Sequence, residues 1–143
     1  MFNLSDDFFI FEPKLFNNAL NSTIIMTNQE IANRLVELCR AGDYETCYKE
    51  LYSPDAWSIE PKGKALTEVA KGMDEFAAKG KIWNENMEEF FGSSISDPIV
   101  ADDYFSVSMM VDCRMKGEER SKTKEICVYK IDGGKIVSEQ FFY

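Results

Sequence analysis

The sequence predicts one α+β domain, in which a strongly curved antiparallel sheet wraps around three helices from the N-terminal half of the chain. Residues 104–115 alternate strictly, with Phe105, Val107, Met109, Val111, Cys113 and Met115 on one side. This period of two is typical of a strand in a sheet with one covered face. Helical spacing is confined to residues before 91, whereas three consecutive strands end the chain. Helices that precede a run of strands favour an α+β fold over alternating βαβ units. A length of 143 residues suits one domain.

The first helix is predicted from about Asn28 to Arg40. Thr27 and Glu30 form a capping box at its start, because the side chain of each can bond the backbone N–H of the other. Gly42 provides the C-terminal stop, and Asp43 caps a second helix that ends at Ser53-Pro54-Asp55. The apolar stripes of these two helices are Ile31, Leu35, Leu38 and Cys39, and Tyr44, Cys47, Tyr48 and Leu51.

Short strands are predicted next, over Ala56–Glu60 and Leu66–Ala70, with a turn at 61–64 between them. A third helix follows from about Met73 to Glu89. The strand after it, from Phe91 to about Ala101, is interrupted by Pro98, which cannot donate a ladder hydrogen bond. The apolar stripe predicted for the third helix is Met73, Phe76, Ala77, Gly80, Trp83, Met87 and Phe90.

The composition excludes several classes of function. The net charge is −9, whereas binding to nucleic acid or to an anionic membrane requires clustered Lys and Arg. We expect a cytoplasmic protein, because the chain has no membrane-spanning apolar run and its N-terminus lacks the basic region of a signal peptide. With no histidine, no CxxC pair and no phosphate loop, we expect neither a metal nor a cofactor. The four cysteines, Cys39, Cys47, Cys113 and Cys127, are predicted to be buried, reduced thiols.

Residues 1–25 differ from the predicted domain at 26–143, because five Phe residues lie among Asn and Asp without a clear period. The capping box follows directly after Met26. Two hypotheses remain open. The extension is not native and translation starts at Met26, or it is a genuine arm that packs its Phe side chains on the domain or on a partner chain.

Four segments occur in an order and spacing known from one protein family. They are Leu51-Tyr52-Ser53-Pro54-Asp55-Ala56-Trp57, Gly72-Met73-Asp74-Glu75-Phe76, Lys81-Ile82-Trp83, and 128–137. With them the chain, over about Thr27–Tyr143, resembles the SnoaL-like branch of the nuclear transport factor 2-like superfamily. The resemblance implies a cone with a pocket at its open end and a homodimer formed through the convex sheet face. Relatives include polyketide cyclases, ketosteroid isomerases and dehydratases, but many are binding modules, so the fold does not define a reaction.

The last hairpin determines which side chains face the interior. We favour a three-residue bulged turn at Asp132-Gly133-Gly134, because it puts the lysines on the outer face, in water. Its inner pairs are Tyr129 with Val137, Cys127 with Glu139, and Glu125 with Phe141. A two-residue Gly-Gly turn would instead pair Tyr129 with Ser138 and place Glu125 and Glu139 on opposite faces.

Two carboxylates on an apolar inner face are the main candidates for chemistry. Without histidine an acid or base must be Asp, Glu, Tyr, Cys or Lys, and burial would raise the pKa values of Glu125 and Glu139 toward those of a general base. Tyr129 is the candidate proton donor. The candidate ligand-binding residues are Trp57, Glu60, Trp83, Met87, Val107, Met109, Cys127 and Phe141. Each also has a structural interpretation, as a paired carboxylate or as a core side chain.

Two functions remain open at this point. The first is binding of a small apolar ligand with a polar handle, with isomerase- or cyclase-type proton transfer next to a carbonyl. The second is a non-catalytic module that binds a ligand or a partner protein as a homodimer. The second predicts a filled interior with its glutamates in salt bridges. Asp112 is expected on the outer face, in water or at a dimer contact.

Overall fold

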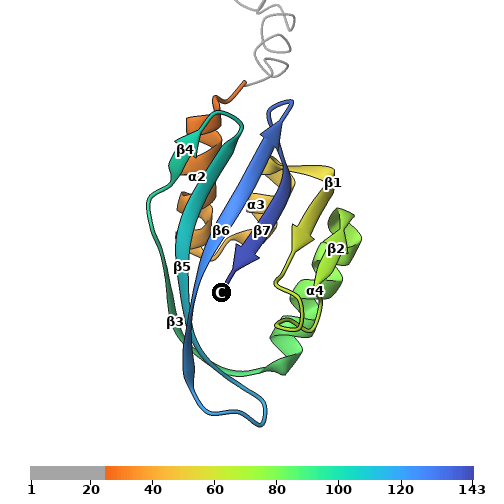
Figure 1. Ribbon diagram of the computed structural model, residues 1–143, viewed down its shortest axis with the longest axis vertical. Helices are drawn as coiled ribbons and strands as arrows, with labels where there is room; N and C mark the ends of the chain where they lie inside the picture. Colours follow the sequence, from red (N-terminus) through yellow and green to blue (C-terminus); the bar gives the residue numbers. More distant parts are fainter. Residues whose placement is uncertain (1–24) are drawn as a thin grey trace, which may run out of the picture.

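The structure is a computed structural model that describes residues 25–143 (Figure 1). Its helices are α2 (Asn28–Ala41), α3 (Tyr44–Leu51) and α4 (Gly72–Asn86). Its strands are β1 (Tyr52–Ile59), β2 (Val69–Lys71), β3 (Met87–Ile95), β4 (Ile99–Ala101), β5 (Tyr104–Met115), β6 (Ser121–Asp132) and β7 (Lys135–Phe142). The predicted α+β class is confirmed, with the helices early in the chain and a run of strands at its end. The Phe-rich extension predicted over 1–25 lies, apart from Ile25, outside the described residues.

All seven strands belong to one curved, unclosed sheet in the order β2-β1-β7-β6-β5-β3, and β4 also pairs with β5 (Figure 1). Every pair is antiparallel except β1 with β7, which is parallel. The sheet is therefore mixed and not wholly antiparallel as predicted, because the last strand of the chain inserts between β1 and β6.

The start of α2 has the predicted capping box. The Glu30 N–H donates to Thr27 Oγ1 at 3.2 Å, and the Thr27 N–H donates to Glu30 Oε2 at 2.7 Å. Gly42 ends the helix with a φ of 71°, which favours glycine, and its N–H bonds the carbonyl of Cys39. Asp43 then caps α3 by accepting from the Thr46 N–H at 3.1 Å. These local signals explain why the starts of both helices could be predicted, whereas α3 ends at Leu51, before the predicted end at Ser53-Pro54-Asp55.

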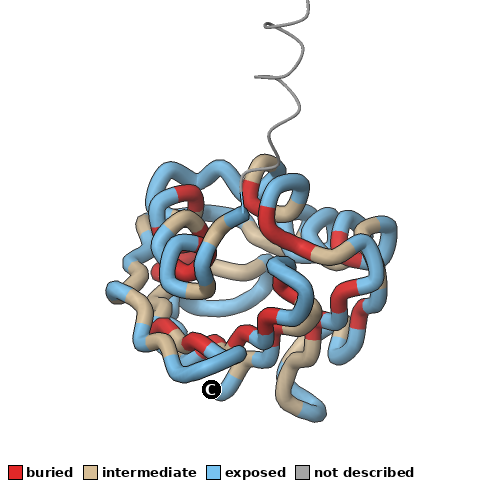
Figure 2. The backbone as a smooth tube through the Cα atoms, turned by 90° about the horizontal axis from the view of Figure 1, so that it is seen from above, coloured by how far each residue is buried: buried red, intermediate tan, exposed pale blue. Residues whose placement is uncertain are grey.

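The core lies between α2, α3 and the inner face of the sheet. In Figure 1 the two helices lie behind β5, β6 and β7, and in Figure 2 buried segments of helix and sheet face one another. The most completely buried large side chains are Phe105, Ile31, Leu35, Leu51 and Ile136. Helix α4 packs mainly on β1 and β2 at one edge of the sheet, while β3 forms the opposite edge.

Several predicted boundaries are wrong. β1 begins at Tyr52 rather than Ala56, because Tyr52 pairs with Ile136 of β7 on the far side of a register shift that contains Pro54. α4 ends at Asn86, so Met87 and Phe90 belong to β3 and not to a helical stripe. The spacing of Met87 and Phe90 is compatible with a helix as well as a strand, and pairing with β5 favours the strand. The predicted interruption at Pro98 is confirmed, since Pro98 lies between β3 and β4.

The register of the last hairpin combines both alternatives. Gly133 and Gly134 have φ values of 57° and 76° and form a two-residue turn, so Asp132 pairs with Lys135. The favoured three-residue turn is therefore wrong. One extra residue in β7 then shifts the ladder, which pairs Tyr129 with Glu139 and Cys127 with Phe141. This bulge returns Glu139 to the face that carries Glu125.

Asp112 faces outward but does not lie free in water. Its side chain is 8% exposed, because Arg120 folds back from the β5–β6 hairpin and donates to both carboxylate oxygens at 2.8 and 2.7 Å. The guanidinium also lies 3.9 Å from the centre of the Phe91 ring. Of the residues described, none forms a helix long and apolar enough to cross a membrane.

Candidate functional site

The inner face carries a buried carboxylate whose two oxygens are both hydrogen-bonded. Glu139, on β7, is 5% exposed. Tyr52 donates its hydroxyl to Glu139 Oε2 at 2.6 Å, and Ser58 donates to Oε1 at 2.8 Å. Tyr52 and Ser58 lie on β1, the parallel neighbour of β7, where Ser58 is directly opposite Glu139. The parallel β1–β7 pair thus positions the donors for this carboxylate.

An ammonium group connects this carboxylate to a second one. Lys79 of α4 donates to Ser58 Oγ at 2.8 Å and forms an ion pair with Glu60 Oε1 at 2.5 Å. Its Nζ lies 4.8 Å from the centre of the Phe141 ring. The C-terminal Tyr143 donates its hydroxyl to Glu60 at 3.1 Å. A continuous polar network therefore runs from Tyr143 and Glu60 through Lys79 and Ser58 to Glu139 and Tyr52.

Glu125 lies on the same face but has the weakest partner of the three glutamates. It is half-buried on β6, and the Cys127 thiol donates to its Oε1 at 3.6 Å. Neither Glu125 nor Glu139 forms an ion pair within 4 Å with a described residue. Burial raises the pKa of Glu125, and the negative charge of Glu60 raises it further against the opposing effects of Cys127 and Lys79.

Glu139 is the hydrogen-bond acceptor of this buried cluster, and the side chains around it are neutral donors. Burial raises the pKa of Glu139, while hydrogen bonds from Tyr52 and Ser58 act in the opposite direction. Burial also raises the pKa values of Tyr52 and Tyr129 well above their usual range, so both phenols stay protonated. Tyr129, the predicted donor, stacks on Phe105 with 4.6 Å between ring centroids. The tyrosine that donates a hydrogen bond to Glu139 is Tyr52.

Sequence reasoning missed Tyr52, Ser58 and Lys79, although two of them left signals. Ser58 lies two residues from both Ala56 and Glu60, so it shares their face of β1. Lys79 lies three residues after Phe76 and four before Trp83, so a charge interrupts the predicted apolar stripe of α4. Nothing in the sequence singled out Tyr52, because the start of β1 was predicted to be the end of the second helix.

The predicted ligand-binding residues divide into four groups. Trp57 lies on the outer face, away from Glu139, where the residue is 42% exposed and Lys71 Nζ lies 4.8 Å from its ring centre. Val107 and Cys127 are buried in the core, and Met109 packs against it. Trp83 is 44% exposed on α4, and Met87 is half-buried at the start of β3. Glu60 and Phe141 are the two that the structure brings together with Lys79.

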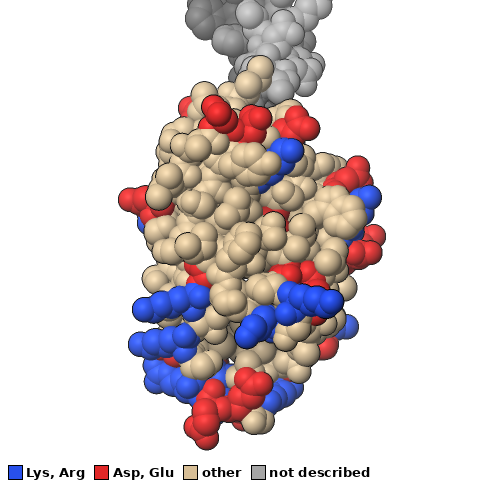
Figure 3. All heavy atoms as spheres, viewed as in Figure 1, with Lys and Arg blue, Asp and Glu red and all other residues tan. Residues whose placement is uncertain are grey.

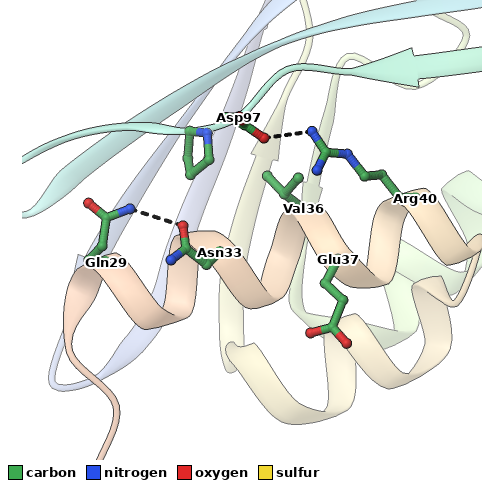
Figure 4. A pocket seen from close by; sticks show the side chains of 7 residues that line it. Gln29, Asn33, Val36, Glu37, Arg40 and Asp97 are labelled. Atoms are coloured by element: carbon green, nitrogen blue, oxygen red, sulfur yellow. Dashed lines mark hydrogen bonds and ion pairs between the residues drawn. The ribbon is translucent and has the colours of Figure 1, made fainter.

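Of two surface depressions, the first lies outside this network and the second touches it at Tyr52. Figure 4 shows one of about 490 Å³ between α2 and the β3–β4 connection, where Arg40 bonds Asp97 at 2.8 Å. The other, of about 380 Å³, lies between α3 and α4 and is lined largely by apolar groups of Tyr48, Tyr52, Met73 and Phe76. Neither is lined by Glu60, Glu125 or Glu139. Within residues 25–143, no group of three or more His, Cys, Asp or Glu side chains could hold a metal ion.

Comparison with known proteins gives the family. Residues 26–143 match the model of the SnoaL-like domain, and the chain therefore belongs to the SnoaL-like family, within the nuclear transport factor 2-like superfamily. No curated protein matches the chain.

Solved structures agree on the fold. A protein from Mesorhizobium loti that carries the name SnoaL-like polyketide cyclase is 31% identical, with 82% of this chain and 100% of that chain covered and a TM-score of 0.76. An NTF2-like protein of unknown function from Burkholderia pseudomallei is 17% identical, with 82% and 92% covered and a TM-score of 0.69. A protein from Catenulispora acidiphila with a ketosteroid isomerase-like fold, in complex with trimethylamine, is 15% identical, with 82% and 87% covered and a TM-score of 0.62.

Proposed function

We propose that the inner face binds a small apolar molecule with a polar handle and that Glu125 exchanges a proton with it next to a carbonyl group. The observation that carries this proposal is that the three glutamates differ in their hydrogen-bond and ion-pair partners. Glu139 has both oxygens bonded and Glu60 is paired with Lys79, whereas Glu125 is half-buried, has a raised pKa and has only a thiol as partner. A carboxyl group with these properties suits general acid–base catalysis near neutral pH.

The other residues have supporting roles in this proposal. Glu139 is a positioning residue, because it fixes Ser58 and through it the Lys79 ammonium. Lys79 provides a hydrogen-bond donor for the polar handle, since Ser58 and Glu60 occupy two of its three N–H groups, and Phe141 provides an apolar contact. Relatives named as a polyketide cyclase, or crystallised with trimethylamine, support binding of small organic molecules by this fold.

Proton exchange into an enolisable ketone tests the proposal. With 2-tetralone in D₂O, the full chain should accelerate α-hydrogen exchange measured by NMR. Glu125→Gln should lower that rate by about 10²-fold or more, the range for loss of a general base. Glu85→Gln, at an exposed glutamate of α4, is the matched control. Equal rates for the two variants, with both proteins folded, would refute the role of Glu125.

A non-catalytic dimeric module is the second candidate. Two observations favour it: both carboxylate oxygens of Glu139 are hydrogen-bonded, and the outer sheet face exposes large apolar side chains. We propose a homodimer through that convex face. The four unpaired thiols support the cytoplasm as its compartment. The ketone-exchange assay distinguishes the two candidates, since a non-catalytic module is expected to leave the uncatalysed exchange rate unchanged.

A further inference from the structure

Two cysteines of the helical hairpin lie next to each other and are not part of the inner-face network. Cys39 lies in the last turn of α2, and Cys47 follows eight positions later in α3. Backbone hydrogen bonds close the hairpin between them, since the Asp43 N–H donates to the Leu38 carbonyl at 2.9 Å and the Cys47 N–H donates to the Asp43 carbonyl at 3.2 Å. Cys47 belongs to the hydrophobic core, and Cys39 packs against it. The Cys47 thiol donates a hydrogen bond to the Cys39 sulfur.

The two thiols differ in exposure and in acidity. Cys39 is half-buried, whereas Cys47 is 2% exposed. The hydrogen bond from Cys47 lowers the pKa of Cys39, against the opposing effects of burial and of the negative charge of Glu139. The same hydrogen bond and burial raise the pKa of Cys47, so its thiol stays protonated. A partly exposed thiolate beside a second, buried thiol is the arrangement that reacts selectively with oxidants.

The other two cysteines have neither property. Cys113 and Cys127 are 4% and 0% exposed, on β5 and β6. The sulfur beside Cys113 is that of Met115, at 4.0 Å, and a thioether cannot form a disulfide. Burial and the Glu125 carboxylate raise the pKa of Cys127. Among the described cysteines, therefore, the Cys39–Cys47 pair is the one suited to oxidation.

We infer that Cys39 is a site of oxidation by hydrogen peroxide and that Cys47 converts the oxidised sulfur into a reversible disulfide between α2 and α3. The Cys39 thiolate attacks one oxygen of the peroxide, the O–O bond breaks, and the released hydroxide takes up a proton to become water. Cys39 is then a sulfenic acid. The Cys47 sulfur displaces the hydroxyl group from the Cys39 sulfur, and the Cys47 proton leaves with it as a second water. Two thiols and one peroxide become one disulfide and two waters.

The pair stays accessible in the homodimer proposed above. Helices α2 and α3 lie behind the sheet in Figure 1, and Figure 3 shows the outer face of the sheet from the same side. A second copy on the outer face therefore leaves the helical layer uncovered. In a reducing compartment the pair is a dithiol, and a transient disulfide there is typical of redox sensing.

Peptide mapping of the full chain tests this inference. Trypsin cleaves after Arg34, Arg40 and Lys49, so Cys39 and Cys47 fall in separate peptides, 35–40 and 41–49. The protein is exposed to hydrogen peroxide, its remaining thiols are alkylated, and the digest is analysed by mass spectrometry. The two peptides should be found joined, and dithiothreitol should separate them.

Single replacements assign the two roles. In Cys47→Ala, oxidation of Cys39 should stop at the sulfenic acid, which dimedone traps as a stable adduct. In Cys39→Ala, Cys47 should react with peroxide roughly tenfold or more slowly than Cys39 does in wild type, because it is buried and protonated. Cys113 and Cys127 are the controls within the same chain and should be alkylated as fully after peroxide as before it.

Joined peptides in the wild-type protein, with dimedone on Cys39 in Cys47→Ala, support the inference. Complete alkylation of Cys39 and Cys47 after peroxide would overturn it, and that result depends on no variant that has to fold. A covalent dimer in gels without reductant would overturn the link within one chain. Equal loss of all four thiols would overturn the selectivity of Cys39.

Discussion

Replacement of Tyr52 by Phe is the most informative single change, because it removes one hydroxyl and leaves the ring. That hydroxyl donates to Glu139 at 2.6 Å, and both residues are buried. In Tyr52→Phe, Glu139 Oε2 loses this donor in a place that excludes water. The ring keeps its edge-on contacts with Tyr48 and Phe76, with centroids 5.0 and 5.9 Å away. Loss of the hydrogen bond is therefore nearly the whole perturbation.

Loss of a buried hydrogen bond to a charged group costs about 1.5–3 kcal/mol of the free energy of unfolding. At roughly 2–4 °C per kcal/mol for a chain of about this size, we expect a melting temperature lower by about 3–12 °C. The effect depends on pH. The Tyr52 bond holds down a Glu139 pKa that burial raises, so its loss raises that pKa further. A carboxyl with a raised folded pKa binds protons more tightly in the folded state, so stability falls as pH rises above the unfolded value of about 4.3.

The assay is thermal unfolding followed by circular dichroism at pH 5 and pH 8. The deficit of Tyr52→Phe should be larger at pH 8, where wild-type Glu139 has more charge to stabilise. Tyr44→Phe, which removes a hydroxyl from a 48% exposed tyrosine of α3, is the matched control and should change the melting temperature little. A Tyr52→Phe deficit equal to that of the control, or one that shrinks as pH rises, would refute the reasoning.

Three further changes probe other parts of the structure. The raised pKa of the Glu125 carboxyl weakens the folded state as pH rises, and Glu125→Gln removes that carboxyl. The melting temperature of this variant should therefore exceed that of wild type at pH 8, and the two should become equal toward pH 4. A higher melting temperature at acid pH alone would contradict this sign. Lys79→Met keeps the apolar stem of the side chain but leaves Glu60 without its ion pair. The free energy of unfolding in urea should therefore fall by about 1–3 kcal/mol. An unchanged urea midpoint would mean that solvent replaces the ion pair. Gly134→Ala puts a Cβ at a φ of 76° and should cost about 1–2 kcal/mol by the same measurement; no loss would indicate that the turn can change type.

The parts of the fold that were predictable are those with local signals. The capping box at Thr27 and Glu30, the stop at Gly42 and the cap at Asp43 act over three or four residues, so the sequence alone located α2 and α3. β5 was predicted from Tyr104 to Met115 because its alternation reflects one covered face. The inward placement of Glu125 and Glu139 was predicted from a turn type that is wrong, and it is correct only because β7 contains a bulge.

What was missed depends on long-range pairing. Tyr52 became part of a strand through its pairing with β7, more than eighty residues later, and no local pattern reveals that. Met87 and Phe90 fit a helical stripe as well as a strand, and the β5 ladder decided between them. The bulge in β7 restored the face of Glu139 after a turn that alone would have reversed it. Lys79 enters the site only because α4 packs on β1, next to Ser58.

Titration of the glutamate side-chain carbons by ¹³C NMR is the most direct test of whether Glu125 is tuned for proton exchange. Spectra of Glu125→Gln and Glu139→Gln provide the assignments. The Glu125 resonance should titrate above the usual glutamate value of about 4.3 and be absent from the spectrum of Glu125→Gln. A Glu125 midpoint at or below that usual value would contradict the proposed proton-exchange site.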